Sequence, residues 1–71
     1  MTATQLKRRF GQRLRELRLE RGVTQEALAN RADVDRAYLS RVERGIANVT
    51  LVMMWKLARV LRVEIVEMLI L

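Results

Sequence analysis

The chain has 71 residues, enough for a single domain, and a domain of this size buries only ~60% of the surface that its unfolded form exposes. It contains no Cys and no His, so disulfides, the usual zinc ligands and the commonest catalytic nucleophiles and bases are missing. An enzyme is therefore not expected, and neither is a metal or a cofactor. Because so small a core usually needs a further source of stability, we expect a second copy of the chain to supply it.

The charge is basic, with 14 Lys and Arg against 8 Asp and Glu, and 12 of the 14 cations are Arg. The planar guanidinium suits phosphates and guanine edges. Residues 1–44 hold 11 basic and 6 acidic side chains, a net +5, whereas residues 45–71 hold 3 and 2. This uneven distribution favours a polyanionic partner over a basic surface that serves solubility alone.

The residues after Met1 are polar and basic, unlike a signal peptide. The longest apolar run, Leu51 to Trp55, is far shorter than the ~20 residues of a membrane span. We expect a cytoplasmic protein with no membrane contact.

The first predicted helix runs from about Thr4 to Arg21, and Gly22 suits the left-handed position that ends it. Its apolar face repeats at helical spacing through Leu6, Phe10, Leu14 and Leu17. Gly11 lowers helix stability by roughly 1 kcal/mol relative to Ala, which indicates close packing of another helix at that point.

Two short helices follow. Thr24 is a good N-cap for a helix of about Gln25 to Arg31, and Asp35 for one of about Arg36 to Arg44, which Gly45 closes. Leu39 and Val42 are the inward positions of the second of these helices.

After a loop at residues 46–49, Thr50 caps a fourth helix that ends near Leu61. Its predicted apolar face consists of Leu51, Met54, Trp55, Ala58 and Leu61. A fifth helix is predicted from Glu64 to Leu71, apolar on more than one face. We interpret Met53, Met54 and Trp55 as core or interface residues rather than as a ligand pocket.

The predicted fold is therefore all-α, a compact five-helix domain over residues 1–71. Two short helices joined by a tight turn, the second one bearing exposed Arg, form a helix-turn-helix over about residues 25–44. Residues 51–71 are the predicted dimerisation region.

The segment resembles the lambda repressor and Cro (XRE) family of helix-turn-helix proteins. The likeness rests on Thr24-Gln25-Glu26, on Ala29 at the helix crossing, on Val34 in the turn and on Glu43-Arg44-Gly45. Asp33 stands where the family usually has a left-handed Gly, a conformation that Asp tolerates. The family also implies an ion pair between Arg18 and Glu43, the alternative being two solvated charges.

Within this family the chain is most similar to restriction-modification controller proteins, through Val34-Asp35-Arg36-Ala37-Tyr38-Leu39-Ser40 and Asn48-Val49-Thr50-Leu51. That similarity implies a transcriptional regulator that binds paired operators in double-stranded DNA as a homodimer, activating at low occupancy and repressing at high occupancy. RNA polymerase is a candidate further partner. Relatives often carry a basic residue at the position of Ala47, so a minor-groove contact from this loop is in doubt.

In a helix-turn-helix the first turn and outward positions of the second helix contact bases. The candidate base contacts are Arg36, Ala37, Ser40 and Arg41. Arg36 is the best candidate for guanine, whereas Arg41 could equally reach a phosphate. The candidate phosphate contacts are Thr24, Gln25, Tyr38, Arg44 and Asn48. For Tyr38, a half-buried ring that supports the helix is an equal alternative.

The last segment carries more apolar side chains than one small core can cover, and we expect Ile65, Met68 and Leu69 to form the dimer interface. Two other interpretations stay open. A phage-type repressor or an antitoxin can use the same fold, and a protein-interaction module could carry a basic face that only aids solubility.

Overall fold

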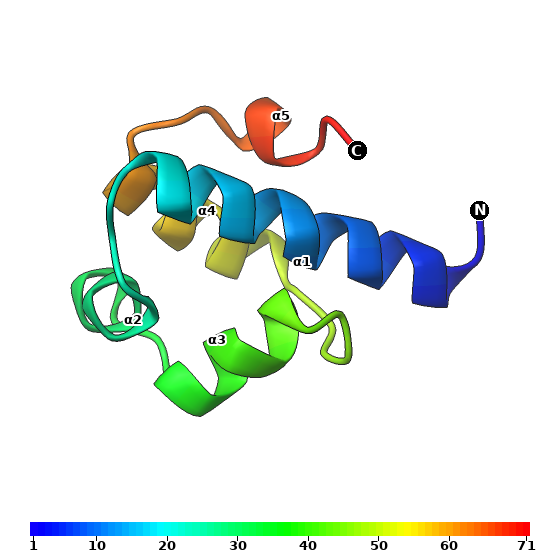
Figure 1. The fold of residues 1–71 in the computed structure, drawn as a ribbon, viewed down its shortest axis with the longest axis horizontal. Helices are drawn as coiled ribbons and strands as arrows, with labels where there is room; N and C mark the ends of the chain where they lie inside the picture. The colour runs from blue at the N-terminus through cyan, green and yellow to red at the C-terminus, as the bar shows by residue number, and fades with distance from the viewer.

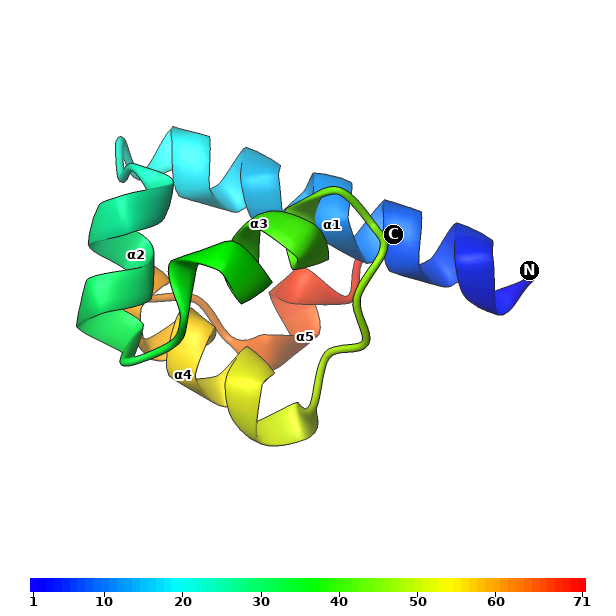
Figure 2. The same cartoon turned by 90° about the horizontal axis from the view of Figure 1, so that it is seen from below.

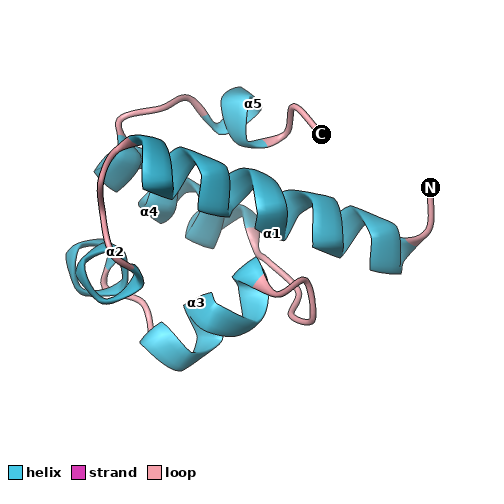
Figure 3. Cartoon of the chain, in the orientation of Figure 1, coloured by secondary structure: helices cyan, strands magenta, loops and turns pink.

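A computed structural model describes all 71 residues as five helices and no strand (Figures 1 and 3). They are α1 (Ala3–Glu20), α2 (Gln25–Ala32), α3 (Arg36–Glu43), α4 (Leu51–Leu61) and α5 (Ile65–Met68). The five-helix, all-α prediction is confirmed. No helix combines the length and the apolar character that crossing a membrane requires.

Side-chain caps fix where the first four helices begin. Thr2, Thr24, Asp35 and Thr50 each accept a hydrogen bond from the backbone N–H three residues ahead. The predicted caps of α2, α3 and α4 are all present. Asp33 adopts the left-handed conformation, with φ 56°, that ends α2 and turns the chain toward α3.

The longest helix, α1, packs on α3 and α5, while α2 packs on α3 and α4. The core between them contains 13 buried apolar side chains, of which Leu14, Leu28, Leu39, Leu57, Leu61 and Met68 are almost completely buried. Four helices thus surround one small core, and α5 covers it from the side of α1 opposite to α3 (Figure 1).

Two glycines let the C-terminal end of α3 lie directly against α1. A Cβ atom on Gly11 would be 2.5 Å from the carbonyl oxygen of Val42 and 2.6 Å from that of Glu43. A Cβ atom on Gly45 would be 2.7 Å from the Cα of Arg8. The close packing expected at Gly11 is therefore present, and it sets the distance between α1 and α3.

The structure corrects the predicted face of α4. Ala58 and Leu61 are buried as expected, but Met53 and Leu57 fill the core, whereas Leu51 and Trp55 are exposed. Both sets repeat at helical spacing, and packing against α2 selects the second. Leu6, predicted on the inner face of α1, is also 46% exposed, because the first turns of α1 extend beyond the other helices (Figure 2).

The fifth helix is shorter than predicted. It was expected from Glu64 to Leu71, yet α5 ends at Met68, and Glu64 makes no side-chain cap. With a single helical turn and no cap, its backbone has little reason to continue as helix beyond the residue that enters the core.

Candidate nucleic-acid interface

The turn between α2 and α3 holds the two helices at a fixed angle. The N–H of Val34 donates to the carbonyl of Ala29 at 2.9 Å, and the Val34 side chain packs against the core. Leu39 and Val42 are buried, so the opposite side of α3 faces outward. Figure 2 views the molecule from that side, with α3 crossing in front of the core and α2 beside it.

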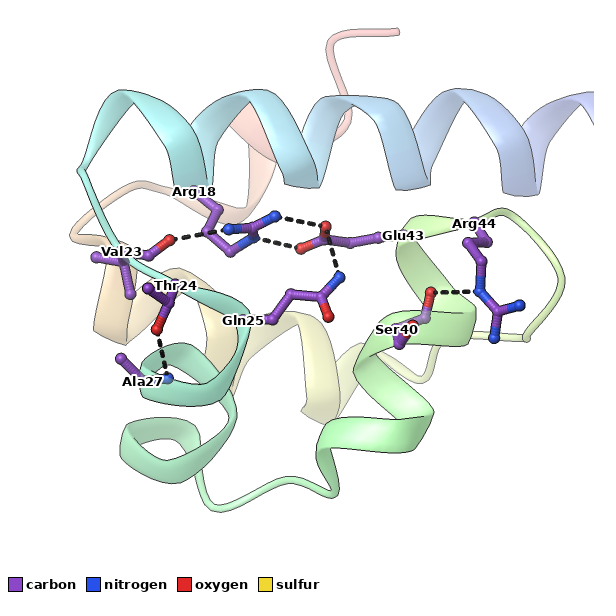
Figure 4. A network of polar contacts seen from close by, with 8 residues as sticks. All are labelled: Arg18, Val23, Thr24, Gln25, Ala27, Ser40, Glu43 and Arg44. Carbon is purple, nitrogen blue, oxygen red and sulfur yellow. Dashed lines mark hydrogen bonds and ion pairs between the residues drawn. The ribbon is translucent and has the colours of Figure 1, made fainter.

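A buried polar network ties α3 to the rest of the domain (Figure 4). Arg18 of α1 donates to both carboxylate oxygens of Glu43 of α3, at 2.7 and 3.0 Å, and its third bond goes to the carbonyl of Val23 at 3.0 Å. Gln25 of α2 donates its side-chain amide to the same carboxylate at 3.1 Å. The ion pair expected from the family is present, and the network joins α1, α2 and α3.

The ion pair at the centre of this network is largely excluded from solvent. The side chains of Arg18 and Glu43 are only 10% and 4% exposed, and no buried polar side-chain atom lacks a partner. A bidentate arginine–carboxylate pair fixes orientation as well as distance. The position of α3 relative to the N-terminus of α2 is thereby fixed before any ligand arrives.

The outward side of α3 carries the predicted base-reading residues. Arg36, Ala37 and Arg41 are exposed, while Ser40 is half-buried. Neither arginine takes part in an ion pair. Their guanidinium donors are therefore free to bind an external partner.

Tyr38 lies at the junction of α3 and the loop that follows it. Its ring packs against the core, its hydroxyl donates to the carbonyl of Asn48, and the guanidinium of Arg41 lies 5.6 Å from the ring centroid. A phosphate contact by Tyr38 would require the bond to Asn48 to open. The supporting role considered for this ring accounts for its position in the free protein.

The other candidate phosphate contacts are accessible. Thr24, Arg44 and Asn48 are exposed, and Gln25 is half-buried. The Thr24 hydroxyl accepts from the N–H of Ala27, while the first two N–H groups of α2 have no hydrogen-bond partner. Arg44 donates its Nε to the Ser40 carbonyl at 3.4 Å.

The three residues predicted for the dimer interface differ in their surroundings. Leu69 is 47% exposed and Ile65 is half-buried against the core, but Met68 is fully buried within the monomer. Met68 has no surface left for a partner, so its placement in an interface is corrected to a core position. No cluster of three acidic side chains that could hold a metal ion is present.

Sequence reasoning missed two contacts of this site. The bond from Gln25 to Glu43 joins residues 18 positions apart, and the stacking of Arg41 on Tyr38 depends on rotamers. The contact of Gln25 with Glu43 could have been suspected from the expected ion pair, because a carboxylate buried beside one arginine retains lone pairs that need further donors.

Fold and site together define a helix-turn-helix domain whose second helix exposes two arginines that take part in no ion pair. Residues 14–68 match the HTH_3 helix-turn-helix family, and the chain belongs to it. It is a DNA-binding regulator of the lambda repressor and Cro type.

Several known proteins are similar over most of their length. The control protein C.MunI of Mycoplasma is 39% identical over 64 residues, which are 89% of this chain and 86% of that one. The restriction-modification controller C.AhdI of Aeromonas hydrophila is 50% identical, with a TM-score of 0.85 over 87% of this chain and 94% of that chain. SinR, a master regulator of biofilm formation solved in complex with DNA, is 34% identical, with a TM-score of 0.81 over 84% of this chain and 97% of that chain.

Proposed function

We propose that this protein is a sequence-specific transcriptional regulator that binds pseudo-palindromic operators as a homodimer, and that it acts as a restriction-modification controller. The observation that carries the proposal is the outward side of α3, where Arg36 and Arg41 are exposed and unpaired. The buried network behind α3 holds this surface in place. Similarity to C.MunI and C.AhdI supports the controller role.

Arg36 is assigned to base reading because it occupies the first residue of α3, where side chains of a recognition helix reach the groove floor. A bidentate contact of arginine to guanine discriminates by about 1–3 kcal/mol. Ala37, Ser40 and Arg41 complete the proposed base-reading surface. Thr24, Gln25, Arg44 and Asn48 are assigned to phosphates on either side of it.

The homodimer is proposed from exposed apolar side chains at the end of the chain. Val66, Leu69 and Ile70 are 66%, 47% and 63% exposed. Leu69 also lines an apolar hollow with Leu6 of α1 and Met54 of α4. A two-fold axis near these residues would cover them, and the dimer would have to hold its two recognition helices about 34–36 Å apart to match half-sites one turn of DNA apart.

Selection of bound sequences from random duplex DNA tests the proposal directly. We expect enrichment of a motif with two related half-sites, and binding to that motif that weakens steeply with added salt. Enrichment without a half-site repeat would contradict the homodimer, and no enrichment at all would contradict sequence-specific binding.

Two alternatives predict other outcomes. A protein-interaction module with a solubilising basic face would bind DNA weakly and without sequence preference. Transcription in vitro from the selected operator, with purified RNA polymerase and increasing protein, separates a controller from a phage-type repressor or an antitoxin that only represses. We expect activation at low protein concentration and repression at high concentration.

A further inference from the structure

A second basic surface lies where the C-terminal halves of α2 and α4 pack together. Two adjoining hollows meet there, and both are bordered by Arg31, Arg59 and Val60. The basic side chains that line them, here called the basic face, are Arg21, Arg31, Lys56, Arg59 and Arg62. No Asp or Glu lines either hollow. Cations from α1, α2 and α4 thus border two hollows that no carboxylate lines.

The basic face is separate from the surface assigned to the operator. In Figure 1, α3 lies at the lower edge and the C-terminal ends of α1 and α4 lie together at the upper left, with α2, which carries Arg31, between them. None of the residues assigned to base or phosphate contact belongs to the basic face. The contacts proposed for the operator therefore use none of these five cations.

The cations of the basic face are free to bind. The two ion pairs of the structure join Arg13 to Glu16 and Arg18 to Glu43, and neither involves this surface. The guanidinium of Arg59 lies 4.9 Å from the ring centroid of Trp55. Such stacking restricts the guanidinium while leaving the N–H groups at its edge available.

We propose that the basic face binds the phosphate backbone of a second stretch of duplex DNA while α3 occupies the operator, an inference that rests on the proposed function. Like charges brought together repel one another unless an anion covers them, and duplex DNA offers one negative charge per ~1.7 Å of its axis. Arginine donors match phosphate oxygens. Trp55 is the one aromatic residue there, and Arg59 stacks on its ring, which disfavours base stacking by a single strand.

The second stretch has two sources, the DNA that flanks the operator or a separate duplex. The test compares a duplex that ends at the edges of the protected operator with one extended by about two helical turns, ~20 bp, on each side. A mixture of two differently labelled short duplexes reports bridging. The variant is Arg31→Gln with Arg59→Gln, and the control is Arg9→Gln with Arg15→Gln. The control removes the same charge from exposed, unpaired positions of α1.

We expect the Arg31 and Arg59 variant to bind the short duplex like the control. On the extended duplex, the slope of log affinity against log salt should fall by about 2 relative to the control, because two phosphate contacts are lost. The two short duplexes carry a donor and an acceptor dye, and energy transfer between them reports bridging. If the Arg31 and Arg59 variant loses this energy transfer but keeps the salt dependence of the control on the extended duplex, the basic face binds a separate duplex. Equal behaviour of variant and control in both assays overturns the proposal, as does an effect confined to single-stranded DNA. Failure of the unaltered protein to bind the short duplex would count instead against the proposed function.

Discussion

The guanidinium of Arg18 and the carboxylate of Glu43 meet through two parallel hydrogen bonds across the α1–α3 contact, with both side chains nearly excluded from solvent. Removing one partner of such a pair leaves the other charge buried without a partner, which lowers the free energy of unfolding by about 3–5 kcal/mol. This is a large part of the stability of a domain of this size.

Arg18→Met should therefore lower the free energy of unfolding by about 3–5 kcal/mol in urea denaturation. Arg15→Met, at an exposed position of the same helix, should change it by less than about 0.5 kcal/mol. The double variant Arg18→Met, Glu43→Met should recover much of the loss, because no unpaired charge remains. A double variant as unstable as the single one would contradict this account.

Gly11→Ala should separate α1 from α3. The added methyl group would lie 2.5 Å from a backbone carbonyl oxygen, so a helix rather than a flexible side chain has to move. We expect a loss of about 1–3 kcal/mol in stability together with weaker operator binding by the folded fraction. Gly22→Ala is the matched control. The added methyl group has no atom within 4 Å, but the φ of +66° at this position is strained for Ala. The Gly22 variant should therefore be less stable while its affinity for the operator stays unchanged.

Arg36→Ala should abolish sequence preference and retain weak binding to any duplex, because the remaining cations still meet phosphates. Arg44→Ala, from the other end of the recognition helix, should weaken binding to all sequences alike. Both effects are measured by comparing the affinity of each variant for the selected operator with its affinity for scrambled DNA. An unchanged ratio between the two DNAs in the Arg36 variant would exclude this residue as the base reader.

Gln25→Ala should weaken binding about equally on every sequence, as expected of a phosphate contact at the start of α2. The substitution also removes one donor from the Glu43 carboxylate, so a modest loss of stability, near 1 kcal/mol, should accompany it. Binding is measured on operators altered at one base pair at a time. A loss confined to one of those positions would assign Gln25 to a base instead.

Val66→Asp with Leu69→Asp should produce monomers in sedimentation equilibrium without unfolding the domain, because both side chains are exposed. Leu19→Asp, at a 57% exposed position of α1, is the control and should leave assembly unchanged. Met68 cannot serve in this test, since a charge in its buried position would unfold the protein. Dimerisation that survives the double change would remove this segment from the interface.

Most of the fold could be predicted because the signals are local. The caps Thr24, Asp35 and Thr50 act on N–H groups three residues away, and Asp33 supplies the left-handed residue of the turn. The register of α4 could not be predicted, since two apolar stripes offset by one or two positions share Ala58 and Leu61. Which stripe is buried depends on the packing of α4 against α2, and this contact joins distant parts of the chain.

The candidate site divides in the same way. The exposed positions of α3 follow from helical periodicity, as for Arg36 and Arg41. The engagement of Gln25 with Glu43 depends on how three helices meet, which no local pattern encodes. The burial of Met68 likewise depends on the way α5 folds back onto α1.

The attachment of α5 to α1 affects more than stability. Arg13 donates its Nε to the carbonyl of Glu67 at 2.8 Å, which fastens α5 to the same helix that carries α3 on its opposite side. In a dimer joined near α5, the two α1 helices would determine the distance from the two-fold axis to each recognition helix. The separation of the two half-sites would then be set by the protein, and an operator with one base pair inserted at its centre would have to be underwound to restore the relative orientation of its half-sites.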